Sequence, residues 1–444
     1  MNNLHSLTSL VDFHGTTAAH RVMDIQRWEA RGARVLFVQT HEIPMFEIKL
    51  DFVAGSSRDG TTPGLALLTN GMLNEGIAGV DAEQLATAFE DQGAEYTNSV
   101  SRDFSTVGLR SLSAPAKRDA AVALLAQVVG NPTLPASALE QIRGQALNLV
   151  KSQQRSAAKR LSDALMRKLY QRHPYEHSRT GTEAGLAVVT LEQIREFHQR
   201  SYGAANLTIS LVGDLSRSEA EAMIADLVAQ LPDSPALTPL PAVAWPGAEV
   251  IHLDAPGADV SVILTLPAIS RADPDHVALT VANMIFGDPN GLEARLMQEL
   301  RVKRGLTYGA YSRLTQLLAS GHWTLSWNTR AQYNDATQDL VENMLRDFLR
   351  DGPTTEELEQ VRAGLLGRYP LQTASNQQIM EQLQIIGSHD LPLDTAQQFV
   401  VELLALTPQS IRAALQRHFD ADQLLYFSIG PDAPQQPLPE LADR

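Results

Sequence analysis

An internal repeat is the feature that most constrains the fold of this chain. The segment that begins at Thr407 aligns with the segment that begins at Thr190 at a constant offset of 217 residues (407 − 190 = 217). Such self-similarity in one register indicates that one structural unit occurs twice, so we expect two related lobes. Seven residues are identical in this register: Ile194, Arg195, Gln199, Arg200, Ala204, Leu207 and Gly213 recur as Ile411, Arg412, Gln416, Arg417, Ala421, Leu424 and Gly430.

A proline-rich segment lies between the two copies. Proline can continue neither a helix nor a central strand. We therefore interpret residues 231–247 as a semi-rigid linker that joins a first lobe over residues 1–230 to a second lobe over residues 248–444. The prolines of the linker are Pro232, Pro235, Pro239, Pro241 and Pro246.

Each copy mixes strand patterns with helix patterns. Apolar and polar residues alternate over residues 46–52, which is typical of a half-buried strand. Two further strands are expected near residues 95–100 and 104–112, and residues 137–170 read as one long helix. Strands in hairpin succession combined with helices favour the α+β class, with antiparallel-rich sheets covered by helices on one face.

Residues 63–76 contain the most informative helix of the first copy. The pattern predicts a helix that begins at Pro63 and ends at Gly76, because proline suits the first helical position and glycine the end. Its apolar residues recur at helical spacing, which predicts that one face lies in the core. These residues are Leu65, Leu68, Met72 and Leu73.

The frame of this helix resembles the signature helix of the M16 (pitrilysin, mitochondrial-processing-peptidase-like) metallopeptidases. In that family Gly-Leu-Ala is followed by the inverted zinc motif His-x-x-Glu-His. Here the three chemical positions of the motif hold Leu67, Asn70 and Gly71. The resemblance extends from about Arg34 to Gly430 and implies the two-lobed M16 fold, which forms half of a clamshell.

The residues at these positions cannot carry the chemistry of the motif. Two histidines at i and i+4 on one helical face can bind Zn²⁺, with a glutamate between them as general base. Leu67 has no lone pair, Gly71 has no side chain, and Asn70 is not a base near neutral pH. Losing a general base typically lowers the rate by about 10²–10⁴. We therefore expect no peptidase activity from the chain alone.

The third metal position implied by the resemblance is also without a ligand. In the family a glutamate follows the second histidine by 75–80 residues, which falls here at residues 147–149. Leu147 and Leu149 flank Asn148, and Glu140 lies too early in the helix. The expectation is therefore no metal in this chain. His173 and His177 are an alternative pair, but Pro174 breaks any helix that would align them, so we expect a loop there.

A second motif is present, at residues 299–308. It resembles the C-terminal Leu-Arg-x-x-x-Gly-Leu-x-Tyr segment of the family, whose arginine and tyrosine help to hold substrate at the zinc site. The matching residues are Arg301 and Tyr308. A guanidinium and a phenol can bind a peptide carbonyl and stabilise an oxyanion. From the residues alone, Arg301 could equally complement a helix dipole and Tyr308 could simply favour a strand.

Composition narrows the function classes. The net charge of −15 (36 − 51) makes nucleic acid and anionic membranes unfavourable partners. The chain has no cysteine, which excludes disulfides and thiol catalysis. No apolar run is long enough to span a membrane, and residues 1–15 lack a signal-peptide core. The sequence as given predicts a cytoplasmic protein, or a periplasmic one if a signal peptide has been removed.

Together these features favour the non-catalytic subunit of a bacterial-type heterodimeric M16B peptidase. The resemblance implies a separate partner subunit that supplies the zinc motif and Zn²⁺, while Arg301 and Tyr308 position extended or unfolded peptides in trans. Two alternatives stay open. One is a purely structural subunit related to peptidases, and the other is a stand-alone peptide-binding module.

Overall fold

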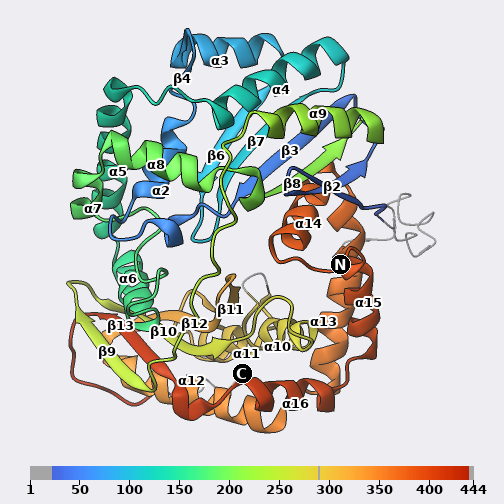
Figure 1. The fold of residues 1–444 in the computed structure, drawn as a ribbon. Helices are drawn as coiled ribbons and strands as arrows, with labels where there is room; N and C mark the ends of the chain where they lie inside the picture. Colours follow the sequence, from blue (N-terminus) through green and yellow to red (C-terminus); the bar gives the residue numbers. More distant parts are fainter. Residues whose placement is uncertain (1–22, 289–290, 440–444) are drawn as a thin grey trace, which may run out of the picture.

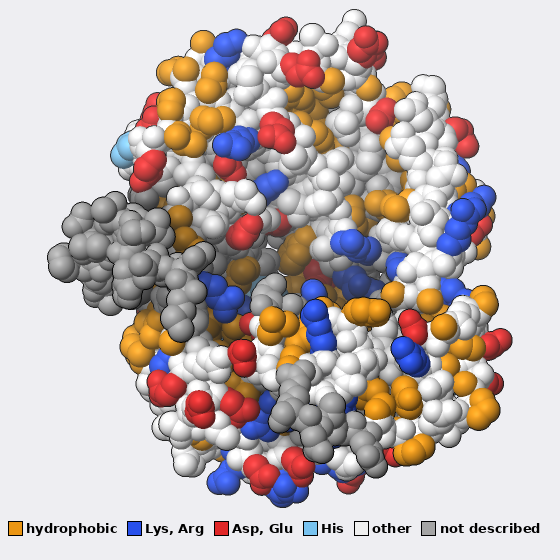
Figure 2. Space-filling model, turned by 180° about the vertical axis from the view of Figure 1, so that it is seen from behind, with side chains coloured by type: hydrophobic (Ala, Val, Ile, Leu, Met, Phe, Trp, Pro, Cys, Tyr) orange, Lys and Arg blue, Asp and Glu red, His pale blue; other side chains and the backbone are white. Residues whose placement is uncertain are grey.

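The structure, a computed structural model, describes residues 23–288 and 291–439. It consists of two lobes, each built on one β-sheet (Figure 1). Seen from behind, the surface is hollowed where the lobes face each other, and lysine and arginine side chains gather along that hollow (Figure 2). Residues 1–15, considered above for a signal peptide, lie outside the described residues. Within the described ranges no helix has both the length and the apolarity needed to cross a membrane.

The first lobe is built on a six-stranded sheet with the strand order β1-β2-β8-β3-β7-β6. β3 pairs antiparallel with β7 and β8, whereas β2 and β8 are parallel. The alternation expected over residues 46–52 is confirmed, since Phe46, Ile48 and Leu50 are fully buried. The strands are β1 (Gln26–Ala30), β2 (Ala33–Gln39), β3 (Met45–Phe52), β6 (Glu95–Val100), β7 (Ser105–Leu112) and β8 (Leu207–Gly213), with a separate short pair, β4 (Gly76–Ile77) and β5 (Val80–Asp81).

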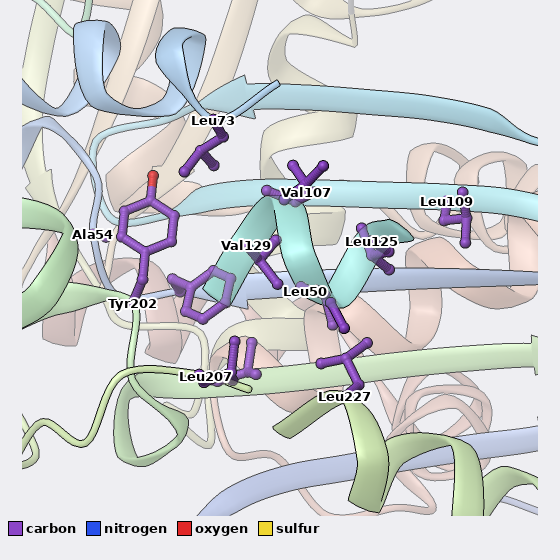
Figure 3. Close-up of a cluster of buried hydrophobic side chains, with 14 of the residues drawn as sticks. Leu50, Ala54, Leu73, Val107, Leu109, Leu125, Val129, Tyr202, Leu207 and Leu227 are labelled. Atoms are coloured by element: carbon purple, nitrogen blue, oxygen red, sulfur yellow. The ribbon is translucent and has the colours of Figure 1, made fainter. Parts of the chain in front are cut away.

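Helices cover one face of this sheet and build the larger core of the lobe. In Figure 3, Leu50 of β3 and Val107 of β7 lie among side chains from helices, including Leu125 and Val129 of α4. This burial of apolar surface is the main driving force for folding the lobe. The helices are α2 (Leu65–Met72), α3 (Ala82–Asp91), α4 (Pro115–Gly130), α5 (Ala136–Gln154), α7 (Glu183–Val188), α8 (Leu191–Ser201) and α9 (Arg217–Ala229).

The second lobe repeats this arrangement on a five-stranded sheet with the order β11-β12-β10-β13-β9. Its one parallel pair, β13 with β9, corresponds to β8 with β2 in the first lobe. The strands are β9 (Glu249–Asp254), β10 (Asp259–Ala268), β11 (Ala310–Gln316), β12 (Gly321–Arg330) and β13 (Leu425–Gly430). The helices are α10 (His276–Gly287), α11 (Arg295–Met297), α12 (Asn334–Asp351), α13 (Thr355–Arg368), α15 (Thr395–Ala405) and α16 (Pro408–His418).

The structure confirms the sequence repeat. α8 and α16 occupy equivalent residues at the offset of 217, and both begin with a capping box, at Thr190 and Thr407. The strands that follow, β8 and β13, both end at the terminal glycine of the repeat. Each strand is buried and lies inside its sheet, with a neighbouring strand on both sides. The duplicated segment therefore supplies an interior strand of each lobe.

Two helices are exchanged between the lobes. α14 (Asn376–Ser388), from the second half of the chain, packs on β2, β3 and β8 of the first sheet. Conversely, α6 (Ala157–Leu169) packs on β10 and β13 of the second sheet. Each sheet is thus covered on both faces, and the expectation of helices on one face only is wrong. The expectation of one helix over residues 137–170 is also wrong, because the chain turns at Ser156, which caps α6.

The segment 231–247 contains neither helix nor strand and is tied to both lobes. The Asn206 side chain donates to the Pro235 carbonyl (3.0 Å) and accepts from the Leu237 N–H (2.7 Å). At the other end, the Trp245 indole N–H donates to the Gln423 carbonyl (3.0 Å). The segment is therefore fixed against the protein by hydrogen bonds.

The lobes also meet at the tips of two hairpins. Asp103, in the turn between β6 and β7, accepts a hydrogen bond from the Leu318 N–H (3.1 Å), in the turn between β11 and β12. The Tyr175 hydroxyl donates to the same carboxyl group and accepts from the Ala319 N–H (3.2 Å). Burial raises the pKa of Asp103. These contacts, with the exchanged helices, fix the position of one lobe against the other.

Candidate functional site

A buried carboxyl group holds the beginning of the helix that carries the degenerate motif. Gly64, with φ +109°, precedes α2, and the Gly64 and Ala66 N–H groups donate to Asp59 (both 2.7 Å). An added Cβ at Gly64 would lie 2.5 Å from the Leu186 side chain, so both the backbone and the packing require glycine. The helix runs from Leu65 to Met72 rather than from Pro63 to Gly76, and its apolar face is buried as expected.

This carboxyl group predicts a pH dependence of stability. Burial raises the pKa of Asp59 to about 7, from 3.8 for an unperturbed aspartate. Between these two values the folded chain binds a proton that the unfolded chain releases. The stabilisation from this group is therefore complete below the unfolded pKa and is lost as the pH rises through the folded pKa. As the pH rises across this window, we expect the free energy of unfolding of wild type to fall by at least about 1.4 kcal/mol relative to that of the Asp59→Asn variant. This difference is the equivalent of one pKa unit.

Urea unfolding of both proteins at a series of pH values measures this difference. Because all other titratable groups are common to both proteins, their contributions largely cancel. A free-energy difference that stays constant from the lower to the higher of the two pKa values would contradict the assignment.

The three motif positions on α2 are integrated into the packing of the lobe. Leu67 is partly buried against the hydrophobic core. Asn70 is buried, and its backbone carbonyl accepts a hydrogen bond from the Asn98 side chain of β6 (3.0 Å). An added Cβ at Gly71 would lie 3.1 Å from the Ile142 Cγ2 of α5. A histidine at position 71 would therefore require Ile142 to move. Leu67 and Gly71 offer no ligand atom, so the residues present do not fit a zinc ion.

The corresponding helix of the second lobe makes the same kind of contact. The Ser312 hydroxyl of β11 donates to the Asn283 carbonyl of α10 (2.9 Å), as Asn98 of β6 does to Asn70 of α2. Both donors lie on the outermost strand of their sheet. In each lobe this contact attaches the backbone of a helix to the edge of the sheet.

No other group in the described ranges replaces the missing zinc ligands. Asp273, Asp275 and His418 are the only three described side chains of suitable type close enough to share an ion, and they lie in the second lobe. Asp275 already accepts two hydrogen bonds from Arg417 (2.7 and 2.9 Å) and one from His418 (2.8 Å). These hydrogen bonds, chiefly those of Arg417, lower the pKa of Asp275. We therefore interpret these side chains as an ion-pair cluster and not as a metal site.

The alternative histidine pair also lies in a loop, as expected. The His173 ring contacts the Pro241 carbonyl through Nε2 (3.0 Å) and the Tyr175 N–H through Nδ1 (3.1 Å). Both ring nitrogens are therefore engaged in the fold and are not available as metal ligands.

The second motif forms a turn with exposed functional groups. A π-helical turn over Gln298–Lys303 follows α11, and Gly305, with φ +61°, ends it. Arg301 is exposed, and Tyr308 is 91% exposed just before β11. Among the described residues neither side chain has a hydrogen-bond or ion-pair partner within this chain. The neighbouring Arg304, in contrast, pairs with Glu299 (2.9 Å).

An open sheet edge lies beside α2. β6 ends the first sheet and pairs only with β7 among the described strands. Most of its side chains are exposed, and no described strand pairs with the backbone groups of its outer edge. Such an edge can accept an additional strand from an extended peptide. β11 forms the corresponding edge of the second sheet.

Comparisons with known proteins agree with these features. Residues 34–183 match the model "Insulinase (Peptidase family M16)", and residues 189–365 match "Peptidase M16 inactive domain". A non-peptidase homolog YmxG of Helicobacter pylori is 23% identical, over 89% of this chain and 91% of the homolog. An uncharacterized zinc protease YmxG of Bacillus subtilis is 21% identical, over 82% of this chain and 87% of that protein.

Solved structures show the same similarity. The structure of a peptidase M16 inactive domain from Pseudomonas fluorescens superimposes with a TM-score of 0.90 and is 42% identical, covering 94% of this chain and 100% of that one. A protease from Helicobacter pylori superimposes with a TM-score of 0.84 at 17% identity, over 92% of this chain and 100% of its own. At that lower identity the likeness is one of fold.

Proposed function

The chain is a non-catalytic member of peptidase family M16, and on that premise we propose that it is one subunit of a heterodimeric M16B zinc peptidase. The partner would be a homologous chain with intact zinc ligands. One contrast within this chain supports the proposal. The three motif positions of α2 pack within the first lobe, whereas the exposed side chains of Arg301 and Tyr308 have no hydrogen-bond or ion-pair partner in the described part of the chain.

In this proposal the chain binds and orients the peptide. The Arg301 guanidinium carries N–H donors that suit a peptide carbonyl oxygen, and the Tyr308 hydroxyl can donate a further hydrogen bond. Donors placed where negative charge develops stabilise the transition state more than the ground state. Arg301 lies in the helical turn before Gly305, and Tyr308 lies between Gly305 and β11, so both residues are attached to the start of this edge strand.

The substrates would be extended or unfolded peptides. The edges formed by β6 and β11 offer free backbone donors and acceptors that only an extended chain can satisfy together. Figure 2 shows a hollow in the surface where the two lobes face each other, and basic side chains gather along it. A folded domain would have to lose its own structure before its backbone could pair with such an edge.

Reconstitution with a zinc-bearing partner tests the proposal. We expect the mixture of the two chains to cleave an unstructured peptide at least about tenfold faster than the partner alone, since positioning of substrate contributes strongly to rate. Light scattering on the same samples should detect a heterodimer. Two separate species together with an unchanged rate would refute it.

The same samples discriminate the two alternatives. A purely structural subunit would assemble with a partner without changing its rate of proteolysis. A stand-alone peptide-binding module would bind unfolded peptides without any partner. The proposed subunit differs from both, because it should form the heterodimer and also raise the rate of peptide cleavage.

A further inference from the structure

A cavity lies where the exchanged helix α14 meets the second lobe. It has a volume of about 330 Å³ and is formed by the loop before α10 together with α14 and α15. This volume falls in the range of pockets that hold small molecules. Its lining combines apolar side chains, such as Ile385 and Phe399, with polar groups that include Arg271, His276 and Gln382.

Arg271 is a partly buried cation without a carboxylate partner among the described residues. Its Nε atom is buried and makes no hydrogen bond within the described residues, and its Nη1 only approaches the Gln316 amide oxygen (3.4 Å). No carboxylate among the described residues lies within ion-pair distance of it. Burial lowers the pKa of Arg271, and no neighbouring negative charge opposes that effect. Burying a charge without a counter-charge is unfavourable, so such a group points to a missing anion.

Two other partly buried arginines show the contrast. Arg58 and Arg102 also have a buried Nε atom without a hydrogen bond. Burial lowers the pKa of each of them, but the negative charge of Asp103 acts against that effect. Arg271 has no such neighbour, although the cavity beside it is large enough to hold one.

The acidic residues around the cavity do not neutralise Arg271. Asp390 pairs instead with Arg27 (3.3 Å) and Arg34 (3.4 Å) of the first lobe. Asp273 lies near His418 (3.7 Å), and Glu402 is exposed on α15. These three carboxylates therefore leave the guanidinium of Arg271 free for another anion.

The histidines near Arg271 add no second charge. The pKa of His276 is lowered to about 3 by burial and by the positive charge of Arg271, and its Nδ1 lies 3.0 Å from the Gln316 amide nitrogen. Burial and Arg271 also lower the pKa of His389. Arg271 is therefore the only cation among the described residues that line the cavity. Because three carboxylates also line it, the site disfavours a ligand with more than one negative charge.

We propose that this cavity binds a carboxylate carried beside an apolar group, such as the C-terminal residue of a peptide or a free apolar amino acid. A carboxylate can receive two parallel hydrogen bonds from a guanidinium, a geometry that a lysine cannot provide. The apolar group would pack against Ile385 and Phe399. This inference is independent of the role proposed for Arg301 and Tyr308.

Calorimetric titration of the full chain with N-acetyl-leucine and with its uncharged amide tests the site. We expect the acid to bind at least about tenfold more tightly than the amide. Arg271→Gln should weaken binding of the acid by a similar factor. Arg155→Gln, at an exposed arginine that ends α5, is the matched control and should leave binding unchanged. Thermal unfolding of each variant confirms that it is folded.

The source of the carboxylate follows from two further probes. Tighter binding of N-acetyl-alanyl-leucine than of leucine would identify a peptide C-terminus, and the reverse order a free amino acid. Equal binding of acid and amide by wild type, or no binding of either at about 10 mM, would overturn the proposal whether or not the Arg271 variant folds. Unchanged binding by a folded Arg271→Gln variant would overturn it as well.

Discussion

Leu383→Ala should lower the free energy of unfolding by about 2–5 kcal/mol, the usual range when a buried leucine is truncated in a core. Leu383 is fully buried in α14, where it packs with Leu36 and Val212 of the first sheet. Truncation would leave a cavity between an element from the second half of the chain and the sheet of the first half. Urea unfolding monitored by circular dichroism measures the change.

The loss of stability should affect both lobes, because α14 connects them. Hydrogen exchange of backbone amides in β2 and β8 should accelerate in the Leu383 variant. Val401→Ala is the control on the neighbouring α15, where the side chain is 60% exposed, and should change stability by no more than about 0.5 kcal/mol. A loss below about 1 kcal/mol for Leu383→Ala would show that α14 does not hold the lobes together.

The repeat in the sequence predicts one part of the fold closely. α16 begins and ends at the residues expected from α8, because the same N-cap chemistry and the same apolar spacing occur in both copies. The interior strands β8 and β13 also end at equivalent glycines. These features depend on local sequence, which is where pattern and propensity are most informative.

The exchange of helices could not be predicted in the same way. The apolar residues of α6 and α14 indicate that one face of each helix is buried, but not which sheet covers it. The sequence pattern also does not predict the turn at Ser156, because no proline or glycine marks it. A Ser side chain that caps the next helix is a weaker signal than either of these residues.

The candidate site likewise has one part that the sequence predicts and another that it does not. The motif positions on α2 are identified through the resemblance to the M16 signature helix, and their residue types already argue against zinc binding. The groups that explain the local structure come from distant parts of the chain: Asn98 bonds to the helix, and Ile142 packs against Gly71. Arg271 gave no signal in the sequence, because the lack of a counter-charge is a property of the folded environment only.

Arg301→Ala should reduce kcat/KM of the reconstituted peptidase by about 10²–10³, the range observed when one donor to a developing oxyanion is removed. The exposed guanidinium has no hydrogen-bond or ion-pair partner among residues 23–288 and 291–439, so we expect folding and assembly to remain intact. Tyr308→Phe removes only the hydroxyl and should reduce the rate less than Tyr308→Ala does. Lys303→Ala is the matched control, since it removes a cation from the same turn without affecting Arg301 or Tyr308.

Zinc content and subunit stoichiometry distinguish the proposed role from indirect effects. If Arg301 positions substrate, its variant should keep both the metal of the partner and the heterodimer while losing turnover. Loss of the heterodimer would instead make Arg301 an interface residue, and wild-type turnover would remove its role altogether. Because a donor aimed at the transition state affects kcat and a ground-state contact affects KM, the division of the loss between these constants identifies the step at which the guanidinium acts.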